Sequence, residues 1–271
     1  MFGPDEFMHS ADQAPEPPSD PASSLQALTL EPLPITVDPA SATAATQAIA
    51  AAKALSEGLG VSCLEFQAFG ASEAKKAQCS PDAFVQMALS LVYYEKEGKL
   101  GAPYESVLAK AFKHGRVTVA RNMSPLIADG LKAFDAMPES SPEEKAAKQA
   151  TFRAMCGDVS RICKDSASAA EFDRPFLAMR GIAKVEGLSF SLAEDPAWGR
   201  MQDLGLCMSH CGKKPIRFFG YEPPSASGYS VGYFVDANNI QACVTCFEKA
   251  KAQPFAAALE ARLLALQKLF A

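Results

Sequence analysis

The sequence predicts an α/β domain in which a mixed sheet is covered by helices. Helical and strand-like segments alternate along most of the chain, and long helical excursions rather than short turns separate several of the strand candidates. The composition, 48% hydrophobic and 21% charged over 271 residues, is typical of a globular protein with a substantial core. These features predict the fold class and leave the function open.

The predicted helices are alanine-rich or amphipathic segments with recognisable ends. Ser41 to Leu59 is rich in alanine and has Gly58 near its end. Ser80-Pro81-Asp82 supplies an N-cap, a first-turn proline and an acid at the positive end of a helix. One face of that helix is apolar and contains Phe84, Met87, Ala88 and Leu91. Four further helices are predicted, at 124–137, 141–164, 168–186 and 254–270.

The predicted strands are short runs rich in β-branched, aromatic and other apolar residues. In chain order they are VSCLEFQ, RVTVAR, GLCMSH, YSVGYFV and NIQACVTCF.

The first part of the chain differs in composition from the rest. Residues 1–27 are rich in Pro, Ala, Ser and acids, and are interpreted as a disordered or loosely attached leader to one folded domain, 28–271. Residues 1–52 carry seven acids and no Lys or Arg, so the remainder has a net charge of +2 against −5 for the whole chain. That mild surplus, without a basic run containing interleaved aromatics, argues against a nucleic-acid partner.

Targeting signals are not visible. No apolar run approaches the roughly 18 residues of a transmembrane helix. The beginning of the chain has no basic n-region, no apolar h-region and no arginine, as a secretory signal or mitochondrial presequence would have. We therefore expect an intracellular protein without a transmembrane segment.

The eight cysteines allow two interpretations, free thiols or a metal site. Cys243 and Cys246, with Cys207 and Cys211, could form a four-thiolate zinc site. However, Cys243 and Cys246 lie in a strand-like run, where their odd separation sends the side chains to opposite faces. Buried free thiols are the favoured interpretation, and no metal site is predicted.

An ordered series of motifs carries a family resemblance. It runs through FG at Phe69, KK at Lys75, SPDAFVQMALSLVYY from Ser80, YES at Tyr104, HGR at His114, FDR at Phe172 and the GYSVGY segment from Gly228. Many elements in this order are far more specific than one short motif. From about Leu30 to its end, the chain resembles the carboxyl-terminal half of the choline/carnitine acyltransferases.

The resemblance implies a fold and a chemistry. The fold would be the carboxyl-terminal lobe of a chloramphenicol-acetyltransferase-like architecture, with a tunnel between two lobes. Coenzyme A or acyl-CoA would enter as a substrate from one side, and carnitine or choline from the other. A positioned base would take the proton of the acceptor hydroxyl, and a hydrogen-bond donor would stabilise the oxyanion.

The same resemblance assigns candidate site residues. Ser209 is the last position of the family's Ser-Thr-Ser motif and would be the oxyanion donor; otherwise it is a strand serine bonded to neighbouring backbone. Coenzyme A would be bound by four residues, Lys75, Lys76, Asp82 and Glu105, although Ala71 replaces another family lysine. For Asp82 and the lysines, a helix first turn and a solvated loop are the structural alternatives.

Acceptor recognition is implied at three further positions. Tyr104 and Arg174 match the carnitine enzymes, and a guanidinium suits the carnitine carboxylate. Val117 replaces their threonine and is choline-like. The acceptor site is therefore a hybrid of the carnitine and choline types.

The catalytic histidine of the family is implied to lie in the missing half. His9, His114 and His210 do not match it, and His210 is predicted to face away from Ser209. Three interpretations follow: a half-enzyme completed by a histidine-bearing first lobe, a catalytically inactive structural subunit of a larger complex, or a lone lobe that senses or carries acyl-CoA. The first two require a protein partner. The family also makes the mitochondrion a candidate compartment.

Overall fold

The computed structural model describes residues 32–211 and 216–271. The chain divides into two compact units, Met1–Ala52 and Lys53–Ala271. The predicted leader, 1–27, lies outside the described residues. Helix α2 (Pro39–Gly58) begins in the first unit and has no buried residues. Its start is capped by the Asp38 carboxylate, which accepts from the Ser41 N–H at 3.0 Å and the Ser41 hydroxyl at 2.6 Å.

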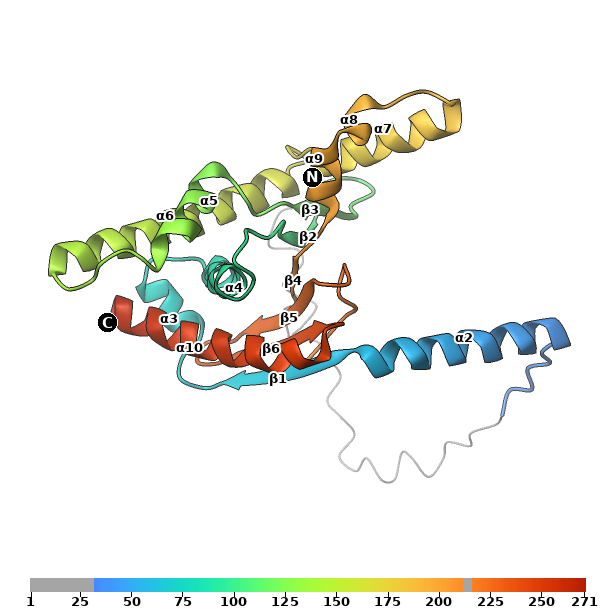
Figure 1. Ribbon diagram of the computed structural model, residues 1–271, viewed down its shortest axis with the longest axis horizontal. Helices are drawn as coiled ribbons and strands as arrows, with labels where there is room; N and C mark the ends of the chain where they lie inside the picture. Colours follow the sequence, from blue (N-terminus) through green and yellow to red (C-terminus); the bar gives the residue numbers. More distant parts are fainter. Residues whose placement is uncertain (1–31, 212–215) are drawn as a thin grey trace, which may run out of the picture. The chain divides into compact units, whose positions relative to one another are not determined.

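The second unit is built on a six-stranded mixed sheet in the order β1-β6-β5-β4-β2-β3 (Figure 1). The strands are β1 (Gly60–Phe66), β2 (Tyr104–Leu108), β3 (Val117–Ala120), β4 (Leu206–His210), β5 (Tyr229–Val235) and β6 (Ile240–Cys246). Strand β4 runs parallel to both β2 and β5, and the other neighbours are antiparallel. The predicted mixed sheet is therefore confirmed.

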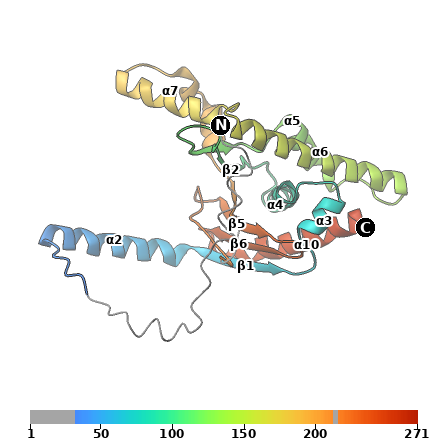
Figure 2. The ribbon, with the colours of Figure 1, turned by 180° about the vertical axis from the view of Figure 1, so that it is seen from behind.

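Helices pack against this sheet, as predicted. In chain order they are α3 (Ala71–Lys76), α4 (Pro81–Glu97), α5 (Pro125–Phe134), α6 (Pro142–Ala167), α7 (Asp173–Glu186), α8 (Ser191–Glu194), α9 (Pro196–Gln202), the short η1 (Lys249–Lys251) and α10 (Ala252–Phe270). Figures 1 and 2 show α10 lying along β1 and β6, with α4 between α6 and the strands. No helix among the described residues is long and apolar enough to cross a membrane.

Helix α4 forms the centre of the core because its sequence is apolar around most of its circumference. Residues from Ala83 to Tyr93 are all buried. Phe84 packs against Phe69 and Phe152 with ring centroids 6.0 and 5.2 Å apart. The helix begins at Pro81 as predicted, although the Ser80 side chain makes no capping hydrogen bond. It ends at Gly98, whose φ of 65° is accessible to glycine without strain.

Gly70 explains the FG motif in structural terms. A Cβ atom at this position would lie 2.2 Å from the Asp236 carbonyl oxygen, closer than any van der Waals contact allows. The next residue, Ala71, donates its N–H to that same oxygen at 2.7 Å. The glycine therefore lets α3 approach the turn between β5 and β6.

Candidate functional site

Tyr104 and Ser209 lie on the same face of the sheet. Ser209 is paired with Gly232 of β5, and Tyr104 of β2 is paired with Cys207 of β4. Since side chains alternate along a strand, Glu105 and Met208 point to the opposite face. Met208 is buried in the core with the helices, so Tyr104 and Ser209 are on the face turned away from that core.

The surroundings of Ser209 separate it from the nearest histidine. Ser209 is half-buried, and His210 is exposed on the other face. The His210 ring lies 5.5 Å from the ring of Tyr233, which is fully buried in the helix-covered core. His210 therefore does not share the face of the Ser209 hydroxyl.

Tyr104 is held by an arginine that sequence reasoning missed. The Arg121 guanidinium lies over the Tyr104 ring, 5.2 Å from its centroid. Its Nε and Nη2 atoms donate to Oδ1 of Asp173 at 3.0 and 2.6 Å, and Nη1 donates to the Met201 carbonyl at 3.3 Å. Both charged side chains are only 11% exposed. The pair thus fixes the end of β3 against the first turn of α7.

Arg174 follows directly in that first turn. Its backbone N–H donates to Glu171 at 3.2 Å, and the other Glu171 oxygen accepts from the Thr118 hydroxyl at 2.7 Å. The Arg174 side chain is 38% exposed, and its Nη1 lies 3.8 Å from Asp173, too far for a hydrogen bond. Its fork of donors is thus positioned by the backbone and remains able to bind an anion.

The structure links two of the three residues expected around the acceptor, Tyr104 and Arg174, through Arg121 and Asp173. Tyr104 contacts Arg121, Arg121 pairs with Asp173, and Asp173 is next to Arg174. Val117 is 43% exposed and pairs with Leu108, at the opposite end of the β2–β3 ladder from Tyr104. At about 3.4 Å per residue, this places Val117 more than about 10 Å along the ladder.

Asp82 and Glu105 belong to a buried polar network that joins α4 to the sheet. The Gln86 amide donates to Asp82 at 2.8 Å and to Glu105 at 2.7 Å. Asn122 donates to the same Glu105 oxygen at 2.9 Å and to Gln86 at 2.6 Å. The Tyr233 hydroxyl donates to Asp82 at 2.6 Å. The two carboxylates expected to face coenzyme A therefore have internal partners.

The burial of this network changes the proton affinity of its members. Burial raises the pKa of the Glu105 carboxyl above its ordinary value, and the nearby Asp82 carboxylate raises it further. Burial, with the Glu105 charge, also raises the pKa of the Cys163 thiol, whose Sγ lies 3.3 Å from Glu105. The pKa of Tyr233 is likewise raised, by burial and then by Asp82.

Glu105→Gln should make the free energy of unfolding of the domain depend less on pH. The raised pKa of Glu105 means that the folded state binds a proton more tightly than the unfolded state. This tighter proton binding stabilises the folded state below the ordinary carboxyl pKa. The stabilisation is lost as pH rises through the pKa that Glu105 has in the folded state. Urea titrations across this range should show the free energy of unfolding of Glu105→Gln rising relative to the wild type as pH increases. Glu260→Gln, at an exposed position, is the control; a pH-independent difference for Glu105→Gln would contradict the argument.

The two lysines expected to bind phosphate lie in the last turn of α3. Lys75 and Lys76 are both exposed, and Lys76 forms an ion pair with Glu73 at 3.1 Å. Ala71, where the family has another lysine, begins the same helix.

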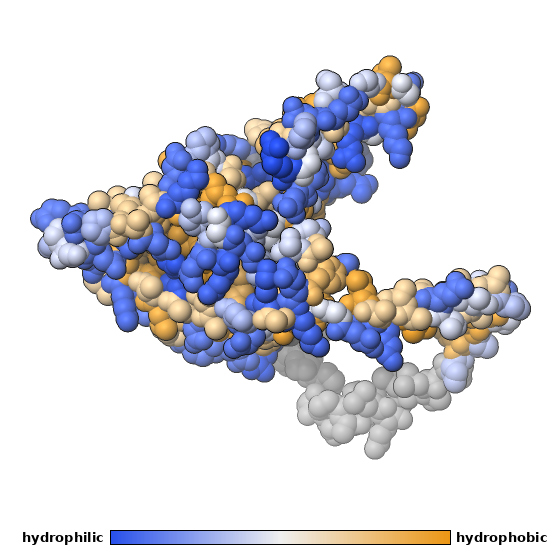
Figure 3. All heavy atoms as spheres, in the orientation of Figure 1, coloured by the Kyte–Doolittle hydropathy of each residue, from blue (hydrophilic) through white to orange (hydrophobic). Residues whose placement is uncertain are grey.

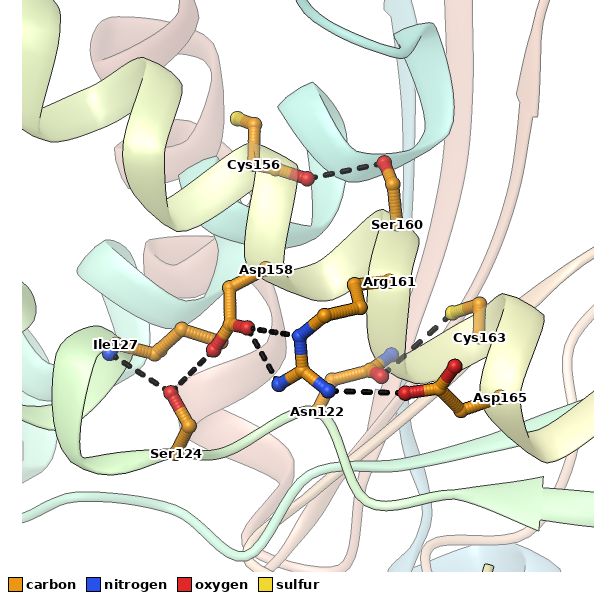
Figure 4. A network of polar contacts seen from close by, with 9 residues as sticks. All are labelled: Asn122, Ser124, Ile127, Cys156, Asp158, Ser160, Arg161, Cys163 and Asp165. Carbon is orange, nitrogen blue, oxygen red and sulfur yellow. Dashed lines mark hydrogen bonds and ion pairs between the residues drawn. The ribbon is translucent and has the colours of Figure 1, made fainter. Parts of the chain in front are cut away.

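A cavity of about 280 Å³ lies among β3, α6 and the start of α7. Its described lining includes Arg121, Arg161 and Asp165, but not Tyr104 or Ser209. Figure 4 shows the Arg161 guanidinium between Asp158 and Asp165, and the Ser124 hydroxyl donating to Asp158. Both arginines of this cavity already have carboxylate partners, Asp173 for Arg121 and Asp158 and Asp165 for Arg161.

Cysteines form no metal-binding cluster in the described part of the chain. Within residues 32–211 and 216–271, no group of three or more His, Cys, Asp or Glu side chains is placed to hold a metal ion. The odd separation of Cys243 and Cys246 within β6 sends their side chains to opposite faces.

Comparisons with known proteins identify the family. The model of the Choline/Carnitine o-acyltransferase family matches residues 5–261, so the chain belongs to that family. It is 30% identical over 249 residues to carnitine O-palmitoyltransferase 2, mitochondrial, of Macaca fascicularis, covering 91% of this chain and 37% of that enzyme. It is 27% identical over 201 residues to the muscle isoform of carnitine O-palmitoyltransferase 1 of Sus scrofa, covering 69% of this chain and 25% of that enzyme.

The chain thus spans between a quarter and little more than a third of the length of these curated relatives. Among solved structures, it is similar to dihydrolipoamide acetyltransferase of Azotobacter vinelandii. That similarity has a TM-score of 0.41 and 11% identity, and covers 94% of this chain and all of that one.

Proposed function

We propose that this chain is one half of an O-acyltransferase that moves an acyl group between coenzyme A and carnitine, or choline, when a histidine-bearing first lobe completes the site. The observation that carries the proposal is the linked set Tyr104, Arg121, Asp173 and Arg174. It presents a partly exposed guanidinium beside the first turn of α7. Such a group suits a carboxylate-bearing acceptor.

The chemistry of acyl transfer requires two functional groups, which we assign to the two lobes. The acceptor hydroxyl is a weak nucleophile, so a base must take its proton as it attacks the thioester carbonyl. The missing lobe would supply that base. In this chain Ser209 would donate its hydroxyl hydrogen bond to the oxyanion that develops on the carbonyl.

Coenzyme A would approach the exposed end of α3. The ammonium groups of Lys75 and Lys76 are exposed, the second beside Glu73, and would neutralise phosphate as point charges. Asp82 and Glu105, which already have internal partners, would shape this side of the site through the position of α4. Coenzyme A is a substrate in this proposal and not a resident cofactor.

An apolar surface supports the need for a companion chain. Helix α7 exposes three large apolar side chains, Leu177, Ile182 and Val185, and Leu188 just after the helix is also exposed. The exposed fractions of these four residues are 52% to 82%. Figure 3 shows apolar side chains interspersed with hydrophilic ones in the region of α7. Exposed apolar groups gathered on one helix are typical of a partner interface.

The alternative, a catalytically inactive structural subunit of a larger complex, has its own support. Of the three residues in the serine-rich family motif, only Ser209 has a hydroxyl, and Met208 is 1% exposed in the core. Polarity has thus been lost beside the proposed oxyanion donor. An acyl-CoA sensor or carrier is less well supported, because Asp82 and Glu105, two of the residues proposed for coenzyme A, already have internal partners.

Arg174→Ala should raise the KM for carnitine in the completed enzyme and leave the KM for choline nearly unchanged. Carnitine has a carboxylate and choline has none. A hydrogen bond to a charged group contributes about 1.5–3 kcal/mol, so an increase of roughly tenfold or more is expected. Steady-state kinetics with both acceptors would measure it, and Arg200→Ala, at an exposed position of α9, is the matched control. Equal changes for both acceptors would exclude a role in carboxylate binding.

The proposed function is tested by isolating the native protein from its source. Co-purifying chains would be identified by mass spectrometry, and the material assayed for acyl transfer from acyl-CoA to carnitine and choline. A histidine-bearing first lobe with measurable transfer would support the half-enzyme. A large assembly without transfer would support the structural subunit. Because the relatives named above include mitochondrial enzymes, we propose mitochondria as the first fraction to examine.

A further inference from the structure

Two cysteines are placed directly opposite each other at the edge of the sheet. Cys63 of β1 pairs with Cys243 of β6 in an antiparallel ladder without interruption from Gly60 to Phe66. Residues paired in this way have side chains on the same face. The same row continues through Gly232 to Ser209, so the two thiols share the face of the proposed oxyanion donor.

The turn between β5 and β6 determines the geometry of this cysteine pair. The Asp236 N–H donates to the Asn239 carbonyl at 3.0 Å, so these two residues form a hydrogen-bonded pair. Hydrogen-bonded and non-hydrogen-bonded pairs alternate, so the pair Gly232 and Cys243 is again hydrogen-bonded. The peptide groups of Cys243 therefore point towards β5 and away from β1. Cys63 and Cys243 are consequently a non-hydrogen-bonded pair.

Such a pair is close enough for a covalent bond. The Cα atoms of non-hydrogen-bonded pairs lie about 4.5 Å apart. Disulfides usually have Cα separations of about 4.4–6.8 Å, so the two sulfur atoms can be joined without moving either strand.

The two thiols differ in their exposure to solvent. Cys63 is exposed, whereas Cys243 is 5% exposed. The segment before β5 covers Cys243, since a Cβ atom on Gly220 would lie 2.9 Å from the Cys243 sulfur. Burial, together with the adjacent Cys63 thiol, raises the pKa of the Cys243 thiol to about 12. An oxidant in solution would therefore react first at Cys63, and Cys243 would be the resolving thiol.

We propose that Cys63 and Cys243 form a reversible disulfide when the protein meets a peroxide oxidant. The Cys63 thiolate attacks one oxygen of hydrogen peroxide, which breaks the O–O bond, releases hydroxide and leaves a sulfenic acid. The Cys243 sulfur then attacks the Cys63 sulfur and loses its proton; the S–S bond forms, the S–O bond breaks and water leaves. Two thiols are oxidised and one peroxide is reduced to water. The product joins edge strand β1 covalently to β6 on the face that contains Ser209.

Peptide mapping of the full chain tests this proposal. The reduced protein would be treated with hydrogen peroxide at low protein concentration, and remaining thiols alkylated before digestion without reductant. We expect a crosslinked peptide that joins Cys63 to Cys243, a monomeric protein that has lost two hydrogen atoms, and full reversal by dithiothreitol. Cys63→Ser should abolish the crosslink, with circular dichroism confirming that this exposed substitution leaves the fold intact. Cys246→Ser, three residues further along β6 and on the opposite face, should retain it.

Two outcomes would overturn the proposal. In one, Cys63 is oxidised to sulfinic acid while Cys243 remains available for alkylation in the denatured protein. In the other, the crosslink joins Cys63 to a different cysteine or to a second molecule. The result does not depend on acyltransferase activity, so the proposed function and this inference can fail independently.

Discussion

Phe84→Ala should destabilise the second unit by about 3–5 kcal/mol, the range for removing a buried aromatic side chain. Phe84 is 2% exposed and lies between Phe69 and Phe152 in the aromatic centre of the core. Truncation would remove its contacts with both rings and leave a cavity that the packed helix cannot fill. Since a domain is usually stable by only about 5–15 kcal/mol, this single change should bring it close to unfolding.

Chemical denaturation monitored by circular dichroism would measure this effect. Leu188→Ala is the control, because Leu188 is also a large apolar residue but is 65% exposed. It should change the free energy of unfolding by less than about 0.5 kcal/mol. Similar losses for the two variants would show that α4 is not the centre of the core.

The burial of Phe84 also explains why the most recognisable part of the sequence says little about activity. The segment around Phe84 and Met87 matches the family because it forms a helix that is buried on nearly all sides. The core of this chain needs such a helix whether or not the protein transfers acyl groups. Motif similarity here therefore predicts the fold better than it predicts the reaction.

Most elements could be predicted because their signals are local. The sequence predicts helix α6 from Ser141, and the structure shows a capping box there. The Ser141 hydroxyl accepts from the Glu144 N–H, and the Glu144 carboxylate accepts from the Ser141 N–H. The strands β4, β5 and β6 were predicted within one residue of their observed ends. These segments have periodic apolar residues or short-range caps that can be recognised without knowing the tertiary structure.

One helix boundary was wrong for a local reason. A single helix was predicted over 168–186, but α6 continues to Ala167 and α7 begins at Asp173. Ser168 donates its N–H to the Lys164 carbonyl and so ends the preceding helix instead of starting a new one. Ala169 then adopts a φ of 61°, which interrupts the helical path. Alanine gives no sequence signal for this left-handed conformation.

The candidate site could be predicted only in part, because its contacts join distant segments. Strand β2 was not predicted, since its outer residues are polar or partly exposed and its one buried side chain is a glutamate. Glu105 is buried only because Gln86 and Asn122, 19 and 17 residues away, donate to it. Arg121 and Asp173 are 52 residues apart. The RVTVAR and FDR motifs contained both charges, but only the fold shows that they pair.

Ser209→Ala should lower kcat about 10²- to 10³-fold in a complex that contains the histidine-bearing lobe, which is the effect of removing one oxyanion donor in a well-studied enzyme. The loss should appear in kcat more than in KM, because the oxyanion exists only as the transition state is approached. Ser209 is half-buried near the end of β4, and alanine should keep the strand and its pairing with Gly232.

Ser230, a second serine on this face of the sheet, provides a control that separates a loss of catalysis from a loss of stability. Ser230 of β5 is fully buried, and its hydroxyl donates to the Glu222 carbonyl at 3.0 Å. Ser230→Ala should therefore lower the free energy of unfolding by about 1 kcal/mol or more and leave kcat nearly unchanged. Ser209→Ala should have the opposite pattern, with stability retained and turnover lost. If Ser209→Ala turned over at the wild-type rate, its hydroxyl would have no role in stabilising the oxyanion, and the half-enzyme would have to obtain that donor from its partner lobe.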